Sequence, residues 1–243
     1  MIETPAVTVI KPVERLIFPL DLPDWNSARA LAKVLNGHVG WFKVGLELFI
    51  AEGPDVVGHL KDLAPDTKIF LDLKLHDIPA TVGRAIGSAV RLGAEMLTVH
   101  AQGGPEMLKA AVEQAGSATT VLAVTVLTSL NPAEMPEITA EYRQPGALVN
   151  FLARQALEAG CRGLVASGQE VAALRHNFGR DPKLVIPGIR PAWSQISGDD
   201  QKRTATPWEA VRDGADYLVI GRPIRDAENP AEAADRVVTE LAG

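Results

Sequence analysis

The chain has 243 residues, a formal net charge of −6, a hydrophobic content of 47% and a single cysteine, Cys161. This length is typical of one (β/α)8 barrel, and the acidic balance argues against nucleic acid as a partner. The sequence has no apolar run of about 18 residues and no basic leader, so we expect a cytoplasmic protein with no membrane contact and no disulfide framework.

Residues 1–15 are expected to form an N-terminal arm, because Pro5 and Pro12 interrupt regular structure. From residue 16 onwards, short apolar runs alternate with amphipathic stretches of helical length. The predicted strands cover residues 16–21, 41–45, 70–75, 96–100, 119–128, 163–166, 184–186 and 217–220. The predicted helices cover residues 24–37, 54–63, 79–93, 105–115, 147–159, 169–177, 207–213 and 230–241.

Eight strand–helix units without an intervening linker predict an α/β protein with one catalytic domain over residues 16–243. A single (β/α)8 TIM barrel is the simplest architecture, because closure removes every sheet edge. A doubly wound open sheet is the alternative. Polar connections over residues 131–146 and 188–206 would be the long loops.

The third predicted strand carries an unusual set of charges. Residues alternate between the two faces of a strand, so Asp72 and Lys74 should share the face opposite the leucines. Asp77 follows in the loop, and Pro79 suits the first turn of the next helix. Active sites of α/β proteins lie at this end of the strands. A purely structural ion pair is the alternative interpretation.

Two further charges stand near the ends of neighbouring strands. Asp21 follows the first strand, and Lys43 lies within the apolar second strand. Buried charges are costly unless they are paired, and an alternating array of acids and lysines would satisfy that need. The array would also offer a proton donor. The alternative is again a structural network.

Cationic and glycine-rich segments follow the last two strands, where barrels often bind phosphate. Arg190 and Arg222 supply forked cationic donors, Gly221 allows close approach of the backbone, and Gln201 adds an amide. Solvent-exposed arginines without a ligand are the alternative.

The spacing D-x-K-x-x-D-I-P-x-T over residues 72–81 resembles the signature of orotidine 5′-phosphate decarboxylase of the bacterial type. Residues 43–45 (KVG), 97–101 (LTVHA), 125–129 (TVLTS) and 220–223 (IGRP) resemble other stretches of that family, in order and on the expected strands. The resemblance implies decarboxylation of orotidine 5′-phosphate to uridine 5′-phosphate and CO2, the last step of de novo UMP biosynthesis. It also implies a cofactor-independent homodimer without a metal ion.

The resemblance assigns roles by position. Asp21 and Lys43 would hold the ribose hydroxyls, and Thr81 would complete the ribose side. Asp72, Lys74 and Asp77 would form the charged network, with Lys74 as proton donor to C6. Asp77 and Thr81 would reach into the partner subunit's site. The pyrimidine would meet Thr128 and Ser129, and the phosphate would meet Arg190, Gln201, Gly221 and Arg222.

Two features depart from the family pattern. Pro19 stands where a small residue with an N–H donor is expected, which questions the regularity of the first strand. The segment from Arg190 to Gln201 is about two residues longer than the family pattern leads us to expect, and loops tolerate such changes in length. Gln195 is therefore the alternative phosphate-loop glutamine.

Two other functions compete with this one. Related sugar-phosphate lyases or decarboxylases share D-x-K-x-x-D but use magnesium with an acid on the second strand, where this chain has Lys43. A non-catalytic barrel could bind only a nucleotide phosphate, although it would have no need of a lysine between two acids. We expect His100 to line the pocket at most, His76 to be structural and Cys161 to be a packing residue.

Overall fold

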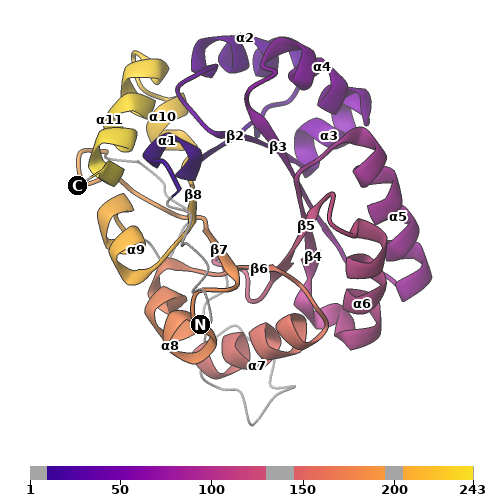
Figure 1. The fold of residues 1–243 in the computed structure, drawn as a ribbon. Helices are drawn as coiled ribbons and strands as arrows, with labels where there is room; N and C mark the ends of the chain where they lie inside the picture. The colour runs from indigo at the N-terminus through magenta and orange to yellow at the C-terminus, as the bar shows by residue number, and fades with distance from the viewer. Residues whose placement is uncertain (1–9, 130–144, 195–204, 243) are drawn as a thin grey trace, which may run out of the picture.

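A closed barrel of parallel strands, ringed by helices, forms the structure (Figure 1). This computed structural model describes residues 10–129, 145–194 and 205–242. The strands follow one another around the barrel in sequence order: β1 (Leu16–Pro19), β2 (Trp41–Gly45), β3 (Lys68–Leu75), β4 (Met96–His100), β5 (Thr120–Val124), β6 (Gly163–Val165), β7 (Lys183–Ile186) and β8 (Tyr217–Val219). The predicted (β/α)8 barrel is therefore confirmed, and the open doubly wound sheet is excluded.

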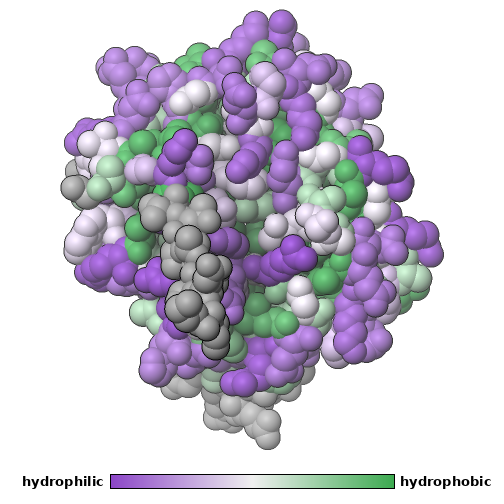
Figure 2. Space-filling model, in the orientation of Figure 1, coloured by the Kyte–Doolittle hydropathy of each residue, from purple (hydrophilic) through white to green (hydrophobic). Residues whose placement is uncertain are grey.

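Helices cover the outside of the barrel. They are α1 (Pro12–Arg15), α2 (Trp25–Leu35), α3 (Leu46–Glu52), α4 (Asp55–Leu63), α5 (Pro79–Leu92), α6 (Gly104–Ala115), α7 (Pro145–Glu158), α8 (Val171–Phe178), α9 (Pro207–Asp213), α10 (Arg222–Arg225) and α11 (Pro230–Ala242), with single 3-10 turns η1 (Ala101–Gly103) and η4 (Gly168–Glu170). None of the helices in the described ranges combines the length and apolarity needed to cross a bilayer. At the end of the barrel that Figure 2 shows, the surface is mainly hydrophilic, with apolar side chains visible between the hydrophilic ones.

The apolar residues form two cores, one on each face of the sheet. The larger core lies between the strands and the helices, and Leu71 and Leu97 belong to it. The smaller core fills the inside of the barrel with side chains from successive strands, namely Ile17, Trp41, Phe70, Met96, Leu122 and Val185. Alternation along each strand sends neighbouring residues to opposite cores. The inner core closes the barrel, so a ligand site can form only at one of its ends.

Strand β3 is irregular where it carries its charges. It pairs with β4 through Phe70 and Leu71 in register with Met96 and Leu97, but the next pair is Leu75 with Val99. Residues 72–74 of β3 therefore oppose a single residue of β4, which makes a bulge. Lys74 has a φ of 48°, so the pairing with β4 is not regular here. The predicted faces are nevertheless confirmed, because Asp72 and Lys74 line the cavity and the three leucines at 71, 73 and 75 pack in or against the larger core.

Several element boundaries also differ from the predictions. Pro12 does not interrupt the chain but begins α1, where its missing N–H costs nothing. The short helices α3 and α10 were not predicted. Strand β5 ends at Val124 rather than 128, although the N–H of Thr125 still donates to Val165 O of β6 at 3.1 Å. Short helices and strand ends carry little periodic signal, which explains these errors.

Cys161 confirms the expected packing role. The side chain is buried in the larger core, and burial raises the pKa of its thiol to about 12. A thiol reacts through its thiolate, so burial and this pKa should together make Cys161 inert in the folded protein.

We predict that an aromatic disulfide reagent at pH 8 will not react with the folded protein over minutes. The same reagent in guanidinium chloride should release one equivalent of chromophore per chain, because the chain has one cysteine. Rapid stoichiometric labelling of the folded protein would contradict the buried position of Cys161.

Candidate active site

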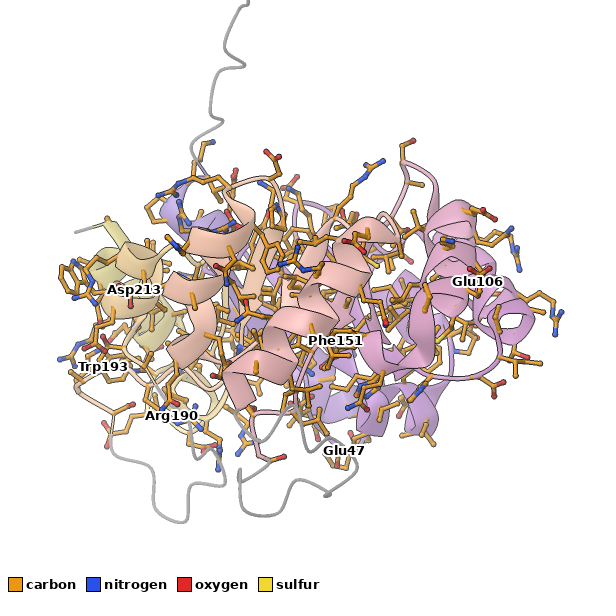
Figure 3. The ribbon with its side chains drawn as sticks, turned by 90° about the horizontal axis from the view of Figure 1, so that it is seen from below. Glu47, Glu106, Phe151, Arg190, Trp193 and Asp213 are labelled. Carbon is orange, nitrogen blue, oxygen red and sulfur yellow. The ribbon has the colours of Figure 1, made fainter. Side chains whose placement is uncertain are left out.

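A cavity of about 450 Å³ opens at the carboxyl ends of the strands. This volume suits a small organic ligand. Arg190 and Glu47, which follow β7 and β2, both lie toward the lower edge of the barrel in Figure 3. The lining residues include eight of the twelve predicted site residues: Asp21, Lys43, Asp72, Lys74, Thr128, Arg190, Gly221 and Arg222.

Lys43 is the centre of a buried charge network. Its Nζ lies 2.9 Å from Asp21 Oδ1 and 3.4 Å from Asp72 Oδ2, and only 9% of its side chain is exposed. Burial by itself disfavours the ammonium, but the carboxylates of Asp72 and Asp21 outweigh burial and hold the pKa of Lys43 above its ordinary value. Lys43 is therefore a permanent cation between two acids.

Asp72 joins this pair to Lys74. Lys74 Nζ donates to Asp72 Oδ2 at 2.7 Å, and the Asp72 side chain is 13% exposed. Burial by itself would raise the pKa of Asp72, but Lys43, Lys74 and a hydrogen bond from Thr98 hold it below the ordinary value. The structure thus confirms the predicted alternation of acids and lysines along Asp21, Lys43, Asp72 and Lys74.

Gly45 makes room for the first ion pair. A Cβ atom at this position would lie 2.7 Å from Asp21 Oδ1 and 2.9 Å from Lys43 Nζ, closer than nonbonded atoms tolerate. Only glycine leaves the Asp21–Lys43 contact undisturbed.

Thr98 of β4 belongs to the same network, and the sequence analysis missed its role. It is fully buried, its hydroxyl donates to Asp72 Oδ1 at 2.9 Å, and its Oγ1 accepts from the N–H of Lys74 at 2.9 Å. A threonine within a buried strand needs a hydrogen-bond partner for its hydroxyl. This need could have identified Thr98 from the sequence as part of a polar network.

His100 and His76 form a pair beside Lys74 rather than in the cavity wall. Their ring centroids are 5.5 Å apart. Burial, His76 and Lys74 lower the pKa of His100, in that order. Neither histidine is among the residues that line the cavity, so the pocket position of His100 is not supported, and the structural role of His76 remains a prediction.

The structure does not bring Asp77 and Thr81 to the charge network of their own chain. Asp77 is exposed, and its Oδ1 accepts from the N–H of Ile78 at 2.6 Å. Within the described part of the chain, Lys74 makes its ion pair with Asp72 and none with Asp77. Asp77 lies in the loop after β3 as predicted, and its part in the charge network remains a prediction.

Cations and a close approach of the backbone mark the side of the cavity after β7 and β8, which adjoins β1 and lies across the barrel from β3. Arg190, Gly221 and Arg222 line it as predicted, and Arg225 adds a third arginine that the sequence analysis missed. Gln201 and its alternative Gln195 both lie outside the described residues.

Pro19 explains why residue 221 is a glycine. A Cβ atom on Gly221 would lie 2.9 Å from Pro19 Cγ, so the proline packs directly on the turn after β8. Pro19 is the last residue of β1, and β8 pairs only with Leu16 and Ile17. The missing N–H of Pro19 is therefore not needed in the sheet, and β1 remains regular up to this residue.

An apolar wall completes the cavity. It comes from β5, β6 and β7 and the segments that follow them, with Val124, Val126, Leu127, Val165, Val185 and Pro187. Thr128 lies at its edge as predicted, whereas Ser129 is exposed and outside the lining. Such a surface suits the faces of a flat ring, and a single hydroxyl can orient its polar edge.

Comparison with known proteins identifies the family. The model of the orotidine 5′-phosphate decarboxylase / HUMPS family matches residues 14–237. Orotidine 5′-phosphate decarboxylase from Anaeromyxobacter sp. (strain K) is 51% identical over 232 residues, which cover 96% of this chain and 100% of the relative. The enzyme of the same name from Nitratidesulfovibrio vulgaris is 45% identical over 252 residues, covering 94% and 98%.

Solved structures agree with these relatives. A crystal structure of orotidine 5′-phosphate decarboxylase from Lactobacillus acidophilus has a TM-score of 0.80 at 36% identity, and the match covers 94% of this chain and 99% of that one. The enzyme of that name from Pyrococcus horikoshii OT3 has a TM-score of 0.76 at 26% identity, covering 94% and 99%. The chain therefore belongs to the orotidine 5′-phosphate decarboxylase / HUMPS family.

Proposed function

We propose that this protein decarboxylates orotidine 5′-phosphate to uridine 5′-phosphate and CO2, as the cytoplasmic last step of de novo UMP biosynthesis. The catalytic domain would be residues 16–243, preceded by an arm of residues 1–15. The observation that carries the proposal is the ammonium of Lys74, held 2.7 Å from Asp72 at a cavity whose other side carries arginines. An anionic substrate with a reacting carbon far from its phosphate fits that separation of charges.

Lys74 is the proposed proton donor. Cleavage of the bond between C6 and the carboxylate releases CO2 and leaves the electron pair on C6. A preorganised ammonium stabilises that developing charge, and Lys74 Nζ then transfers its proton to C6. Asp72 orients the Lys74 side chain before the reaction through the 2.7 Å contact with its Nζ, and solvent restores the proton afterwards. Proton transfer and charge stabilisation thus use the same group.

The remote phosphate supplies binding energy. Arg190 and Arg222, with Gly221 and Gln201, would hold the phosphate dianion by charge-assisted hydrogen bonds. Interactions with a remote part of the substrate can be used to position the reacting centre. Asp21 and Lys43 would bind the ribose hydroxyls between the two ends, and Thr128 and Ser129 would meet the pyrimidine.

A homodimer with shared sites would complete the charge network. Asp77 and Thr81 do not line the cavity of their own chain, which supports the proposal that they act in the partner's site. Ile78, beside Asp77, is 66% exposed, and Ile50 on the neighbouring α3 is 78% exposed. Exposed apolar side chains at adjacent strand ends favour burial against a second copy of this chain.

A reaction without cofactor or metal fits the charges better than a magnesium-dependent one. The sugar-phosphate enzymes considered above would need an acid at the position of Lys43. Here the ammonium of Lys43 itself lies between Asp21 and Asp72. A divalent cation at the same point would meet a fixed positive charge, so these acids favour the role of lysine partners.

The first test is loss of the orotate absorbance when the purified protein is mixed with orotidine 5′-phosphate in excess chelator. We expect the absorbance to fall and uridine 5′-phosphate to be the product by chromatography. An unchanged spectrum from folded protein would move the proposal to the magnesium-dependent relatives, which the same sample tests after addition of magnesium and a keto-sugar phosphate.

Replacement of Lys74 by alanine tests the proton donor. We expect Lys74→Ala to lower kcat by at least about 10⁴-fold, because both the proton and the preorganised charge are lost. Lys109→Ala, which removes an exposed lysine paired with Glu106 on α6, is the matched control and should keep wild-type turnover. Near-normal turnover of a folded Lys74→Ala variant would sink this mechanism.

Mixed dimers test the sharing of sites. After subunit exchange, equal amounts of Lys74→Ala and Asp77→Ala should recover about a quarter of wild-type activity, because each mixed dimer contains one intact site. Lys74→Ala mixed with Asp72→Ala should recover nothing, since those residues contact each other within one chain. Mass spectrometry would verify exchange, and equal recovery in both mixtures would contradict the sharing of Asp77.

A further inference from the structure

Thr98 is the residue of β4 that faces the bulge in β3. The register passes from Leu71 opposite Leu97 to Leu75 opposite Val99, so Thr98 alone opposes residues 72–74. Its side chain is fully buried. A buried hydroxyl that meets three residues instead of one can control the geometry of that segment.

One hydroxyl group makes two different hydrogen bonds there. It donates its proton to Asp72 Oδ1 and accepts the N–H of Lys74, both at 2.9 Å. A threonine hydroxyl can do both at once, because it has one donor and two acceptor positions. The hydroxyl therefore replaces the main-chain acceptor that a regular strand would offer to Lys74.

The backbone at Lys74 needs this support. Its φ of 48° is uncommon for a residue with a side chain, and such conformations persist where the surroundings hold them. The Lys74 side chain is also held, because Nζ donates to Asp72 Oδ2 at 2.7 Å. Thr98, Asp72 and Lys74 thus form a closed ring of three hydrogen bonds.

We infer that Thr98 is a positioning residue for the decarboxylation: its hydroxyl holds Lys74 in the positive-φ conformation and orients Asp72, which together aim the ammonium into the cavity. The inference rests on the proposed function for its effect on turnover. A merely structural role would lower stability and leave the reaction unchanged.

The decisive variant is Thr98→Val, which keeps the shape and removes both hydrogen bonds. We expect kcat to fall by about 10- to 100-fold, because losing a residue that holds a catalytic group, or moving that group by about 1 Å, has effects of this size. KM should change by less than about threefold. Thr98→Ser, which restores the hydroxyl, should return kcat to within about threefold of the wild type.

Thr119→Val is the matched control. Thr119 is also buried, and its hydroxyl donates to Ala94 O at 2.7 Å, at the opposite end of the strands from the cavity. This variant should lose thermal stability and keep its kcat. A wild-type kcat in Thr98→Val, with a loss of stability similar to that of Thr119→Val, would overturn the inference.

A crystal structure of Thr98→Val tests the inference without turnover. A return of Lys74 to negative φ, or separation of its Nζ from Asp72, is expected; an unchanged Lys74 would overturn the inference. If the valine variant does not fold, Thr98→Ser and Thr98→Cys are compared instead, because they match in size and differ in hydrogen-bonding strength. Wild-type protein that is inactive on orotidine 5′-phosphate would refute the proposed function, and the structures would still decide the role of Thr98.

Discussion

The buried carboxylate of Asp72 is the constraint on which the site depends. Removing an anion from water is costly, and here Lys43, Lys74 and Thr98 together compensate it. The lowered pKa of Asp72 means that its contribution to folding is present above about pH 4 and is lost as the pH falls through the lower folded value. The raised pKa of Lys43 gives a contribution that is lost only as the pH rises above about 10. Asp72 and Lys43 are therefore both charged across the neutral range.

This network also dictates the backbone around it. Gly45 has no side chain because a Cβ atom would collide with the Asp21–Lys43 pair. Strand β3 leaves its regular register at Asp72, and Lys74 adopts a positive φ. Natural proteins retain unfavourable backbone conformations of this kind where function needs a particular arrangement of side chains. Here the bulge brings two charged side chains of one strand into contact at the mouth of the barrel.

The sequence predicted the barrel and most of the site, because alternating strands and helices with charges at strand ends produce a strong pattern. The predicted contact of Asp72 with Lys74 is confirmed, but the prediction assumed a regular strand, which places both residues on one face. The actual strand reaches this contact through a bulge. Within the bulge, the N–H of Lys74 donates to the hydroxyl of Thr98, which lies 24 residues further along the chain. Local patterns do not contain such a pairing, and they do not reveal how Pro19 contacts Gly221.

The cavity divides into sectors that follow the order of the strands. The lysines and acids come from β1 to β3, the apolar wall from β5 to β7, and the arginines from the segments after β7 and β8. Barrel closure places β8 beside β1, so the arginines adjoin Asp21. A ligand could then place a phosphate at the arginines, a polyol at the lysines and acids, and a flat ring against the apolar wall. Under the proposed function, the separation of charges around a rigid barrel would orient the nucleotide before any reaction, and electrostatic catalysis requires such preorganisation.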